Sequence, residues 1–233
     1  MNLLSIKGLN QSYGTSHTLW DIDLEVAQGS RMCLMGRNGM GKTTLLKCVM
    51  GLLRVSSGTI GYRGTDLRSI PAEGRARLEI GYVPQGREIF PQLTVQENLA
   101  IGLTARQGNK RTIPSHVYEL FPVLKDMLGR RGGDLSGGQQ QQLAIGRALV
   151  LEPKLLILDE PTEGIQPNII HEIGDIILKL NTEAGVTVLL VEQKLLFARR
   201  VASDFCILEK GRTVTKGKIE DLSDAEVREH LAV

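Results

Sequence analysis

The sequence predicts an α/β fold that has an antiparallel β-subdomain at its N-terminus and a helical subdomain in its middle. Three observations support this prediction: alternating strand patterns within residues 3–35, a glycine-rich loop between a strand and a helix within residues 31–50, and two continuous apolar runs at residues 154–158 and 186–191. Alternation favours half-buried strands, and continuous apolar runs of this length are typical of a parallel sheet covered on both faces.

The N-terminal region begins with strand patterns and ends with the loop and the helix. Ile22, Leu24 and Val26 alternate with acidic residues, which favours antiparallel strands. Residues 31–35 form a further apolar strand, and residues 43–50 then carry apolar side chains at helical spacing. We therefore expect strand, loop and helix to follow one another directly.

The middle region, about residues 86–150, is interpreted as a helical subdomain. It contains helix-favouring segments punctuated by proline, among them residues 117–128 and 139–150. The two apolar runs come after it, with a helical pattern at residues 168–180 between them. We expect residues 1–233 to form a single domain that includes this subdomain.

The last region predicts a hairpin and a short helix. Residues 205–208 and 213–215 have strand patterns on either side of a Lys-Gly turn. Ser223 and Glu226 have the spacing of a capping box, which would begin a short last helix.

Composition and charge argue against several classes of protein. The net charge is only +2 and aromatic residues make up 4% of the chain, so we expect no nucleic acid partner. Cys33, Cys48 and Cys206 lie in apolar runs without metal-ligand spacing, which favours buried thiols and a reducing cytosol. No apolar stretch approaches the roughly 20 residues of a membrane helix. A function at a membrane would therefore depend on another chain.

A phosphate-binding loop is the strongest chemical signal. It reads Gly-Arg-Asn-Gly-Met-Gly-Lys-Thr and lies between the predicted strand and helix. Gly36, Gly39 and Gly41 permit the backbone angles that turn N–H groups toward a phosphate, and the helix N-terminus adds favourable dipole charge. We expect Lys42 to neutralise the β- and γ-phosphate oxygens of a nucleotide and Thr43 to ligate Mg²⁺.

An apolar strand that ends in two carboxylates is the second signal. Asp159 and Glu160 follow residues 155–158, and such acids are costly at the end of a buried strand unless cations or water meet them. We expect Asp159 to hold Mg²⁺ through its water shell and Glu160 to polarise the attacking water. With the phosphate loop, these acids predict a nucleoside triphosphatase whose further role stays open.

A second anion-binding helix start narrows that role. The segment Leu-Ser-Gly-Gly-Gln at residues 135–139 precedes a helix-forming run. The hydroxyl of Ser136 and the N–H groups of Gly137 and Gly138 suit a γ-phosphate. Since one nucleotide site already has its phosphate loop, we expect each chain to complete the site of a partner.

In these motifs the chain resembles the ATP-binding subunits of ABC transporters, and the resemblance covers essentially its whole length. It implies the ABC ATPase form of the P-loop NTPase fold, with ATP and Mg²⁺ as cofactors. Taken singly, Tyr13 could be an ordinary strand tyrosine and Gln85 a loop amide. The motifs occur in the family's order: the adenine-stacking position at Tyr13, the phosphate loop with Gly36, Asn38, Gly39, Gly41, Lys42, Thr43 and Thr44, the Mg²⁺-sensing glutamine at Gln85, the signature with Ser136, Gly137, Gly138 and Gln139, and the carboxylates Asp159 and Glu160.

Two loops resemble one branch of the family, the importers of hydrophobic and branched-chain amino acids. Residues 85–91 and 161–167 carry this likeness and are most similar to its urea and short-chain amide members. The resemblance implies the ATPase subunit of an importer for urea or short-chain amides, with a branched-chain amino acid importer as the alternative. Ile89 and Phe90 either contribute to a groove for a helix of the membrane subunit or belong to the core of the helical subdomain.

Two positions depart from the family pattern. Gln193 follows Glu192 where a histidine is usual, and Gln166 stands where the loop after Glu160 usually has an aspartate. A glutamine can donate a hydrogen bond but does not titrate near neutral pH. Gln193 therefore either assists catalysis as a neutral donor or only caps the strand end, and Glu160 is expected to be the base.

The resemblance also implies partners. A second ABC ATPase chain, identical or related, would form a dimer with two MgATP between the subunits. Permease subunits would hold it at the cytoplasmic side of the cell membrane, and an extracytoplasmic solute-binding protein would act indirectly. Two rival interpretations are an export ATPase and a soluble ABC ATPase of DNA repair or translation, although the latter class carries a coiled-coil insertion or a second cassette not found here.

Overall fold

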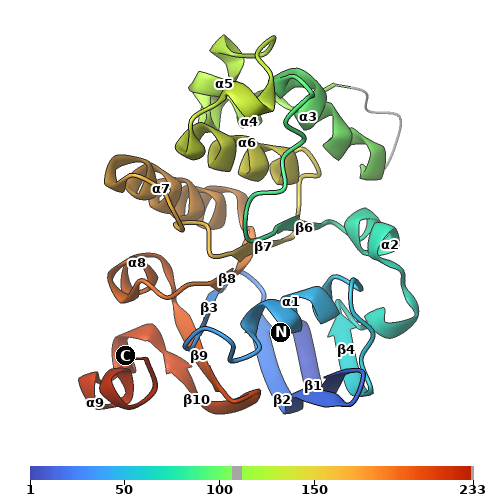
Figure 1. The fold of residues 1–233 in the computed structure, drawn as a ribbon, viewed down its shortest axis with the longest axis vertical. Coiled ribbons are helices and arrows are strands. Elements are labelled where there is room, and N and C mark those ends of the chain that lie inside the picture. Colours follow the sequence, from blue (N-terminus) through green and yellow to red (C-terminus); the bar gives the residue numbers. More distant parts are fainter. Residues whose placement is uncertain (107–111, 232–233) are drawn as a thin grey trace. The chain divides into compact units, whose positions relative to one another are not determined.

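The computed structural model describes residues 1–106 and 112–231 and divides the chain into two compact units. The first unit comprises Met1–Arg75 and Thr187–Val233, and the second comprises Ala76–Val186. Figure 1 shows the helices and strands of both. Residues 107–111 of the predicted helical subdomain lie outside the described part. The single-domain organisation stays a prediction.

An antiparallel sheet begins the first unit, as the alternating pattern predicts. Its strands lie in the order β2-β1-β4-β5, and Figure 1 labels the first three. Their bounds are β1 (Asn2–Tyr13), β2 (Ser16–Ala27), β4 (Ser57–Tyr62) and β5 (Thr65–Asp66). Ile22, Leu24 and Val26 are fully buried along one face of β2, whereas the acidic residues between them are exposed. The alternation therefore separates a core face from a solvent face.

A second sheet in the first unit carries the phosphate loop. β3 (Arg31–Met35) pairs in parallel with β8 (Thr187–Val191) and β9 (Asp204–Glu209), and β9 forms the predicted antiparallel hairpin with β10 (Arg212–Lys218). Every residue of β8 is buried, which agrees with a parallel strand covered on both faces. α1 (Lys42–Val49) follows β3, and α8 (Leu195–Val201) follows β8.

The C-terminal end of the first unit begins its short helix as predicted. Ser223 Oγ accepts a hydrogen bond from the N–H of Glu226, and the Glu226 carboxylate accepts one from the N–H of Ser223. The 3-10 turn η4 (Ile219–Asp221) precedes this capping box. The box begins α9 (Asp224–Glu226), and the chain continues as a π-helical turn, η5 (Val227–Leu231).

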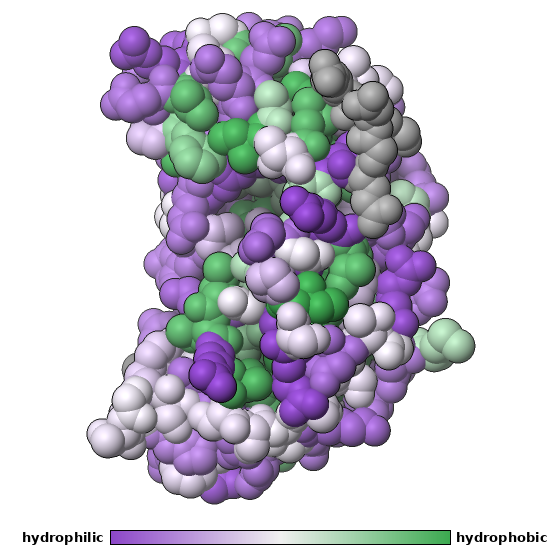
Figure 2. Space-filling view, turned by 90° about the vertical axis from the view of Figure 1, so that its right-hand side faces the viewer, coloured by the Kyte–Doolittle hydropathy of each residue, from purple (hydrophilic) through white to green (hydrophobic). Residues whose placement is uncertain are grey.

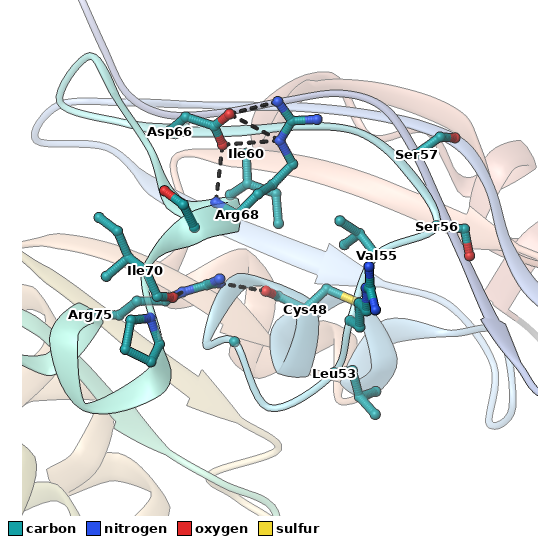
Figure 3. A pocket seen from close by; sticks show the side chains of 14 residues that line it. Cys48, Leu53, Val55, Ser56, Ser57, Ile60, Asp66, Arg68, Ile70 and Arg75 are labelled. Carbon is teal, nitrogen blue, oxygen red and sulfur yellow. Dashed lines mark hydrogen bonds and ion pairs between the residues drawn. The ribbon is translucent and has the colours of Figure 1, made fainter.

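A buried arginine ties the end of α1 to the segment that leads into α2 (Ala72–Arg77). The guanidinium of Arg75, which is 4% exposed, donates to the carbonyl oxygens of Cys48 and Val49 at 2.7 Å each. It also donates to the carbonyls of Leu67 (2.6 Å), in the 3-10 turn η1 (Leu67–Ser69), and Ile70 (2.8 Å). The last carbonyls of a helix lack intrahelical partners, and Arg75 satisfies two of them, of which Figure 3 shows the one at Cys48.

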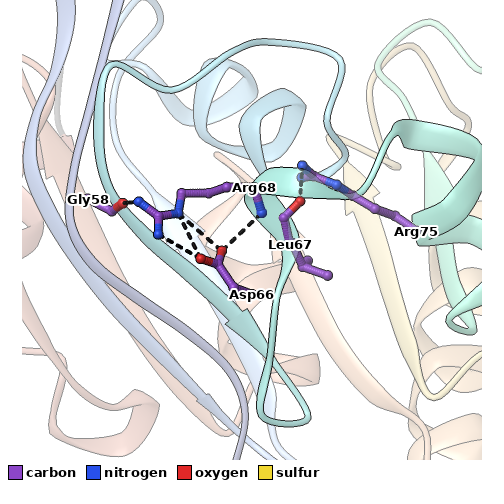
Figure 4. Close-up of polar contacts among 5 residues, drawn as sticks. All are labelled: Gly58, Asp66, Leu67, Arg68 and Arg75. Carbon is purple, nitrogen blue, oxygen red and sulfur yellow. Dashed lines mark hydrogen bonds and ion pairs between the residues drawn. The ribbon is translucent and has the colours of Figure 1, made fainter.

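A cavity of about 710 Å³ lies beside this arginine in the first unit. Figure 3 shows its lining, in which apolar side chains such as Leu53, Val55 and Ile60 stand near polar ones. Arg68 also lines it, but its guanidinium is held by Asp66 at 2.7 Å and by the Gly58 carbonyl (Figure 4). The cavity thus combines apolar walls with two arginines, Arg68 and Arg75, whose guanidinium groups already have protein partners.

The second unit combines a parallel strand pair with most of the helices. β6 (Ile80–Val83) pairs in parallel with β7 (Leu155–Asp159). The helices are α3 (Val95–Ile101), α4 (Ser115–Leu120), α5 (Pro122–Asp126), α6 (Gly137–Leu149) and α7 (Pro167–Ala184), with 3-10 turns η2 (Gly102–Ala105) and η3 (Gly132–Asp134). The helix-favouring residues 117–128 lie in two short helices, α4 and α5. Phe121 leaves the helical backbone region before Pro122, as residues that precede proline commonly do.

One face of the molecule is largely polar. On the face that Figure 2 shows, hydrophilic residues predominate and hydrophobic ones gather in small groups. Phe90 is 46% exposed, so it is not a core residue. A groove at this position for a helix of the membrane subunit stays a prediction. Within the described residues, no helix is both long enough and apolar enough to span a membrane.

Candidate nucleotide-binding site

The glycine-rich loop connects β3 to α1, where the sequence predicts it. Gly36, Gly39 and Gly41 have φ angles of +142°, +78° and +98°, values that residues other than glycine rarely adopt. At Gly36 an added Cβ would lie 2.3 Å from the carbonyl oxygen of Leu208 in β9. Only glycine therefore lets the loop pass this close to the neighbouring strand.

Lys42 and the start of α1 make the loop a fitting cradle for phosphate. The ammonium of Lys42 donates to the carbonyls of Gly36 (2.8 Å) and Arg37 (2.9 Å), although the residue is only 4% exposed. The N-cap residue of α1 is Gly41, which has no side chain to bond the N–H groups of the first turn, and that turn has no acidic residue. The N-terminal N–H groups and the lysine together suit the phosphates of ATP.

Tyr13 ends β1 near the start of α1. Its hydroxyl lies 3.4 Å from Thr44 Oγ1, and the residue is 49% exposed. The contact brings the predicted adenine position and the phosphate loop together within the first unit. An exposed ring at this place can offer a face to a base.

Gln193 also reaches the phosphate loop. Its Nε2 donates to Asn38 Oδ1 at 2.7 Å. The preceding residue, Glu192, is 2% exposed, and its Oε1 accepts from the N–H groups of Gln193 (2.9 Å) and Lys194 (3.0 Å). The sequence does not indicate this contact with Asn38, because no pattern in the chain pairs these two residues.

The carboxylates and Gln85 come together in the second unit. Asp159, at the end of β7, is 1% exposed. Glu160 follows in the left-handed backbone region with φ +50°. The Nε2 of Gln85 lies 3.5 Å from Glu160 Oε2 and donates to Glu163 Oε2 at 3.0 Å. Glu163 was not expected at the site, although it lies within residues 161–167, the loop that resembles the importer branch.

Arg87 joins three segments of the second unit, a role that the sequence did not reveal. It has φ +70°, and its guanidinium donates to Gln140 Oε1 (3.2 Å) of α6 and to the carbonyl of Glu163 (3.4 Å). Arg147 of α6 donates in turn to the carbonyls of Arg87 and Glu88. These contacts hold the segment that follows Gln85 against the signature helix.

The predicted signature begins α6. Ser136 Oγ accepts from the N–H of Gln139 (3.3 Å), and Gln139 Oε1 accepts from the N–H of Ser136 (2.9 Å). A cavity of about 400 Å³ opens here, lined by residues 136–139 and also by Gln166 and Glu172. Gln166, the second departure from the family pattern, therefore faces the signature within its own chain.

The described residues contain no cluster of side chains that could bind a metal ion by itself. Across residues 1–106 and 112–231, no group of three or more His, Cys, Asp or Glu side chains could hold a metal ion. Thr43 belongs to the first unit, and Gln85 and Asp159 belong to the second. Their roles toward Mg²⁺ stay predictions.

Known proteins resemble this chain in sequence and in fold. The sequence profile of the ABC transporter family matches residues 19–163. The high-affinity branched-chain amino acid transport ATP-binding protein BraG of Pseudomonas aeruginosa is 44% identical over 213 residues, which are 91% of each chain. The probable branched-chain amino acid transport ATP-binding protein LivF of Archaeoglobus fulgidus is 37% identical over 97% of this chain and 96% of its own length.

Two solved structures share the fold. An ATP-binding cassette of an ABC transporter, in its ADP conformation, has a TM-score of 0.83 and 27% identity over 98% of each chain. A dimeric cassette in a post-hydrolysis state with ADP and Pi has a TM-score of 0.85 over 94% of this chain and all of its own, at 24% identity. A profile match over more than half of the residues, with relatives of this identity and coverage, shows that the chain belongs to the ABC transporter family as one of its ATP-hydrolysing subunits.

Proposed function

We propose that the chain energises an importer for branched-chain amino acids. The names of the relatives from Pseudomonas and Archaeoglobus support this solute, because both are branched-chain amino acid transport proteins that match nearly the whole chain. The narrower likeness to urea and short-chain amide importers rests on residues 85–91 and 161–167 alone. The relatives reported above do not support it, and it stays a second, untested prediction.

The proposed complex places the chain at the cytoplasmic face of a membrane. A second ATPase subunit would pair with it, as the dimeric form of the related cassette suggests. Permease subunits would carry the solute, since no described helix could span a membrane. An extracytoplasmic binding protein would deliver the solute. Hydrolysis removes the γ-phosphate that favours the closed dimer, so ATP turnover can drive the permeases between states.

The phosphate loop is the observation that carries the proposed ATP chemistry. Its backbone turns at three glycines with positive φ, and Lys42 lies inside the loop with its ammonium on two backbone carbonyls. This arrangement positions one cation and the N-terminus of α1 for the phosphates. Tyr13 would stack on the adenine, and Thr43, Gln85 and Asp159 would hold Mg²⁺, which screens charge on the β- and γ-phosphates.

Glu160 is proposed as the base. It follows the buried Asp159, and its Oε2 lies 3.5 Å from the Gln85 amide nitrogen, so a neighbouring donor can orient it. Gln193 would donate a neutral hydrogen bond to the γ-phosphate or the water. Ser136, Gly137, Gly138 and Gln139 would serve the nucleotide of the partner subunit through the N-terminus of α6.

Replacing Glu160 by Gln tests this proposal. Hydrolysis should fall by roughly 10²–10⁴-fold while ATP binding persists, because only water activation is lost. With MgATP the variant should elute as a dimer in size-exclusion chromatography. Glu119→Gln, which neutralises an exposed acid on α4, is the matched control and should behave as wild type. A Glu160→Gln chain that stays monomeric and hydrolyses normally would contradict both roles.

The solute is tested on the intact complex. An affinity tag on this chain should isolate the membrane complex, and the binding protein identified with it can be titrated with leucine, valine, urea and acetamide. We expect binding of the branched-chain amino acids. Binding of urea or acetamide alone would instead favour the second prediction.

A further inference from the structure

We propose that Asn38 is a positioning residue that orients the side chain of Gln193 for ATP hydrolysis. The inference rests on the proposed role of Gln193 and adds a second residue to it. Its basis is the 2.7 Å hydrogen bond from Gln193 Nε2 to Asn38 Oδ1, which joins residues 155 positions apart in the sequence. Both residues belong to the first unit.

The backbone of Gln193 is held independently of this contact. The buried carboxylate of Glu192 accepts from the N–H groups of Gln193 and Lys194, so the turn after β8 has a fixed course. The Gln193 side chain itself is exposed. A long exposed side chain samples several rotamers unless a partner selects one, and Asn38 is such a partner.

The chemistry of an amide explains why this contact matters. The NH₂ group of glutamine has two hydrogens in one plane, and a neutral amide keeps both at any physiological pH. When Asn38 accepts one hydrogen, the plane is set and the direction of the second hydrogen follows. Asn38 is itself part of the phosphate loop, so the second hydrogen is oriented relative to the backbone that binds the phosphates.

This mechanism differs from the one available to a histidine at position 193. A neutral imidazole carries a single N–H, on one of its two ring nitrogens, so it could not donate to Asn38 and to a phosphate from the same atom. The amide can. The pairing of Gln193 with a carbonyl acceptor on the loop therefore suits the residue that this chain has.

The expected effect is modest, because both side chains are exposed and the bond is neutral. Such a bond contributes enough to change a rate by about 3–10-fold. Asn38→Ala removes only the side-chain acceptor and keeps the backbone N–H of the loop. It should therefore lower kcat by about 3–10-fold while the ATP dissociation constant changes less than about 2-fold.

A double-mutant cycle on the assembled transporter complex tests the inference. The variants are Asn38→Ala, Gln193→Ala and the double variant, and Gln28→Ala, which removes an exposed amide in the turn after β2, is the matched control. Steady-state turnover and direct ATP titration are measured for each. If Asn38 acts through Gln193, Asn38→Ala should lower kcat in the wild type but change it less than about 2-fold in the Gln193→Ala background.

The possible failures are distinguishable. An equal loss of kcat from Asn38→Ala in both backgrounds, or a loss explained by weaker ATP binding, overturns the positioning role and leaves the proposed function intact. Full activity of Gln193→Ala at every pH overturns the role of Gln193 itself, and the positioning role with it. The role of Glu160 as the base is tested separately, by the hydrolysis rate of the Glu160→Gln variant. It therefore does not depend on the result of this cycle.

Discussion

At the scale of single residues, backbone groups hold some of the site side chains. Lys42 bonds to two carbonyls of its own loop, and Glu192 accepts from two N–H groups of its own turn. Such local contacts hold a side chain without help from distant segments. Tyr13 differs, because its ring is half exposed and only its hydroxyl approaches Thr44. Its proposed contribution therefore depends on the nucleotide.

A pair of substitutions separates the ring of Tyr13 from its hydroxyl. Tyr13→Ala should weaken ATP binding by roughly 1–3 kcal/mol, the range for a base stacked on an aromatic side chain. Tyr13→Phe keeps the ring and loses only a 3.4 Å contact, so it should bind ATP nearly as wild type. Isothermal titration of both variants checks this. Unchanged affinity in Tyr13→Ala would remove the residue from the adenine site.

The three cysteines should be inert in the folded chain. Burial raises the pKa of Cys48 to about 12 and that of Cys206 to about 11, and it also raises the pKa of Cys33. The thiolate is the reactive form, so at pH 8 its fraction at Cys206 falls about 100-fold, in addition to the steric protection. A thiol reagent should label all three only after denaturation. Rapid labelling of the native chain would contradict this burial.

At the scale of elements, α1 is matched to opposite charges at its two ends. Its N-terminus follows the phosphate loop, and its C-terminus is met by the buried guanidinium of Arg75. Because the helix dipole is positive at the first end and negative at the second, both arrangements are favourable. The helix that would bind the nucleotide is thus also fastened at its far end, through contacts with the segment around η1.

Two arginines of the same segment give a matched test of this element. Arg75→Met should lower the free energy of unfolding by about 2–4 kcal/mol, because four carbonyls lose a charged donor. Arg68→Met breaks an ion pair on the surface and should lower it far less (Figure 4). Urea unfolding of both variants measures the difference. Equal losses would show that burial of the guanidinium is not decisive.

At the scale of the whole molecule, the chemical groups are divided between two compact units. The phosphate loop and Gln193 belong to the first, and the carboxylates, Gln85 and the signature belong to the second. Each unit has its own strand pairing and its own hydrogen-bond network around these groups.

The signature is predicted to serve another chain. Ser136→Arg should lower hydrolysis by at least about 100-fold, as the loss of a transition-state donor does, while the isolated variant binds ATP with unchanged affinity. Ser115→Arg, at the exposed start of α4, is the control and should stay active. Turnover of the assembled complex and ATP titration of the isolated chain are compared. Weakened ATP binding by isolated Ser136→Arg would place the signature in the chain's own site.

The sequence by itself determined the elements whose signals are local. The glycine-rich loop, the strand that ends in Asp159, the C-terminal hairpin and the Ser223 capping box each lie within a few consecutive residues, where spacing and backbone preference act directly. The helix-favouring segment at residues 117–128 is also local, and Pro122 marks the point at which its second short helix begins.

Only the tertiary structure decided which side chains meet. Hydrogen bonds join Gln193 to Asn38, Arg75 to the C-terminal end of α1, and Gln85 to Glu163. No periodicity encodes such pairs, because each partner is brought close by the packing of strands and helices that are far apart in the chain. The residue types of the site therefore follow from the sequence. The orientation of their side chains follows instead from packing between distant segments, in which each contact depends on many others.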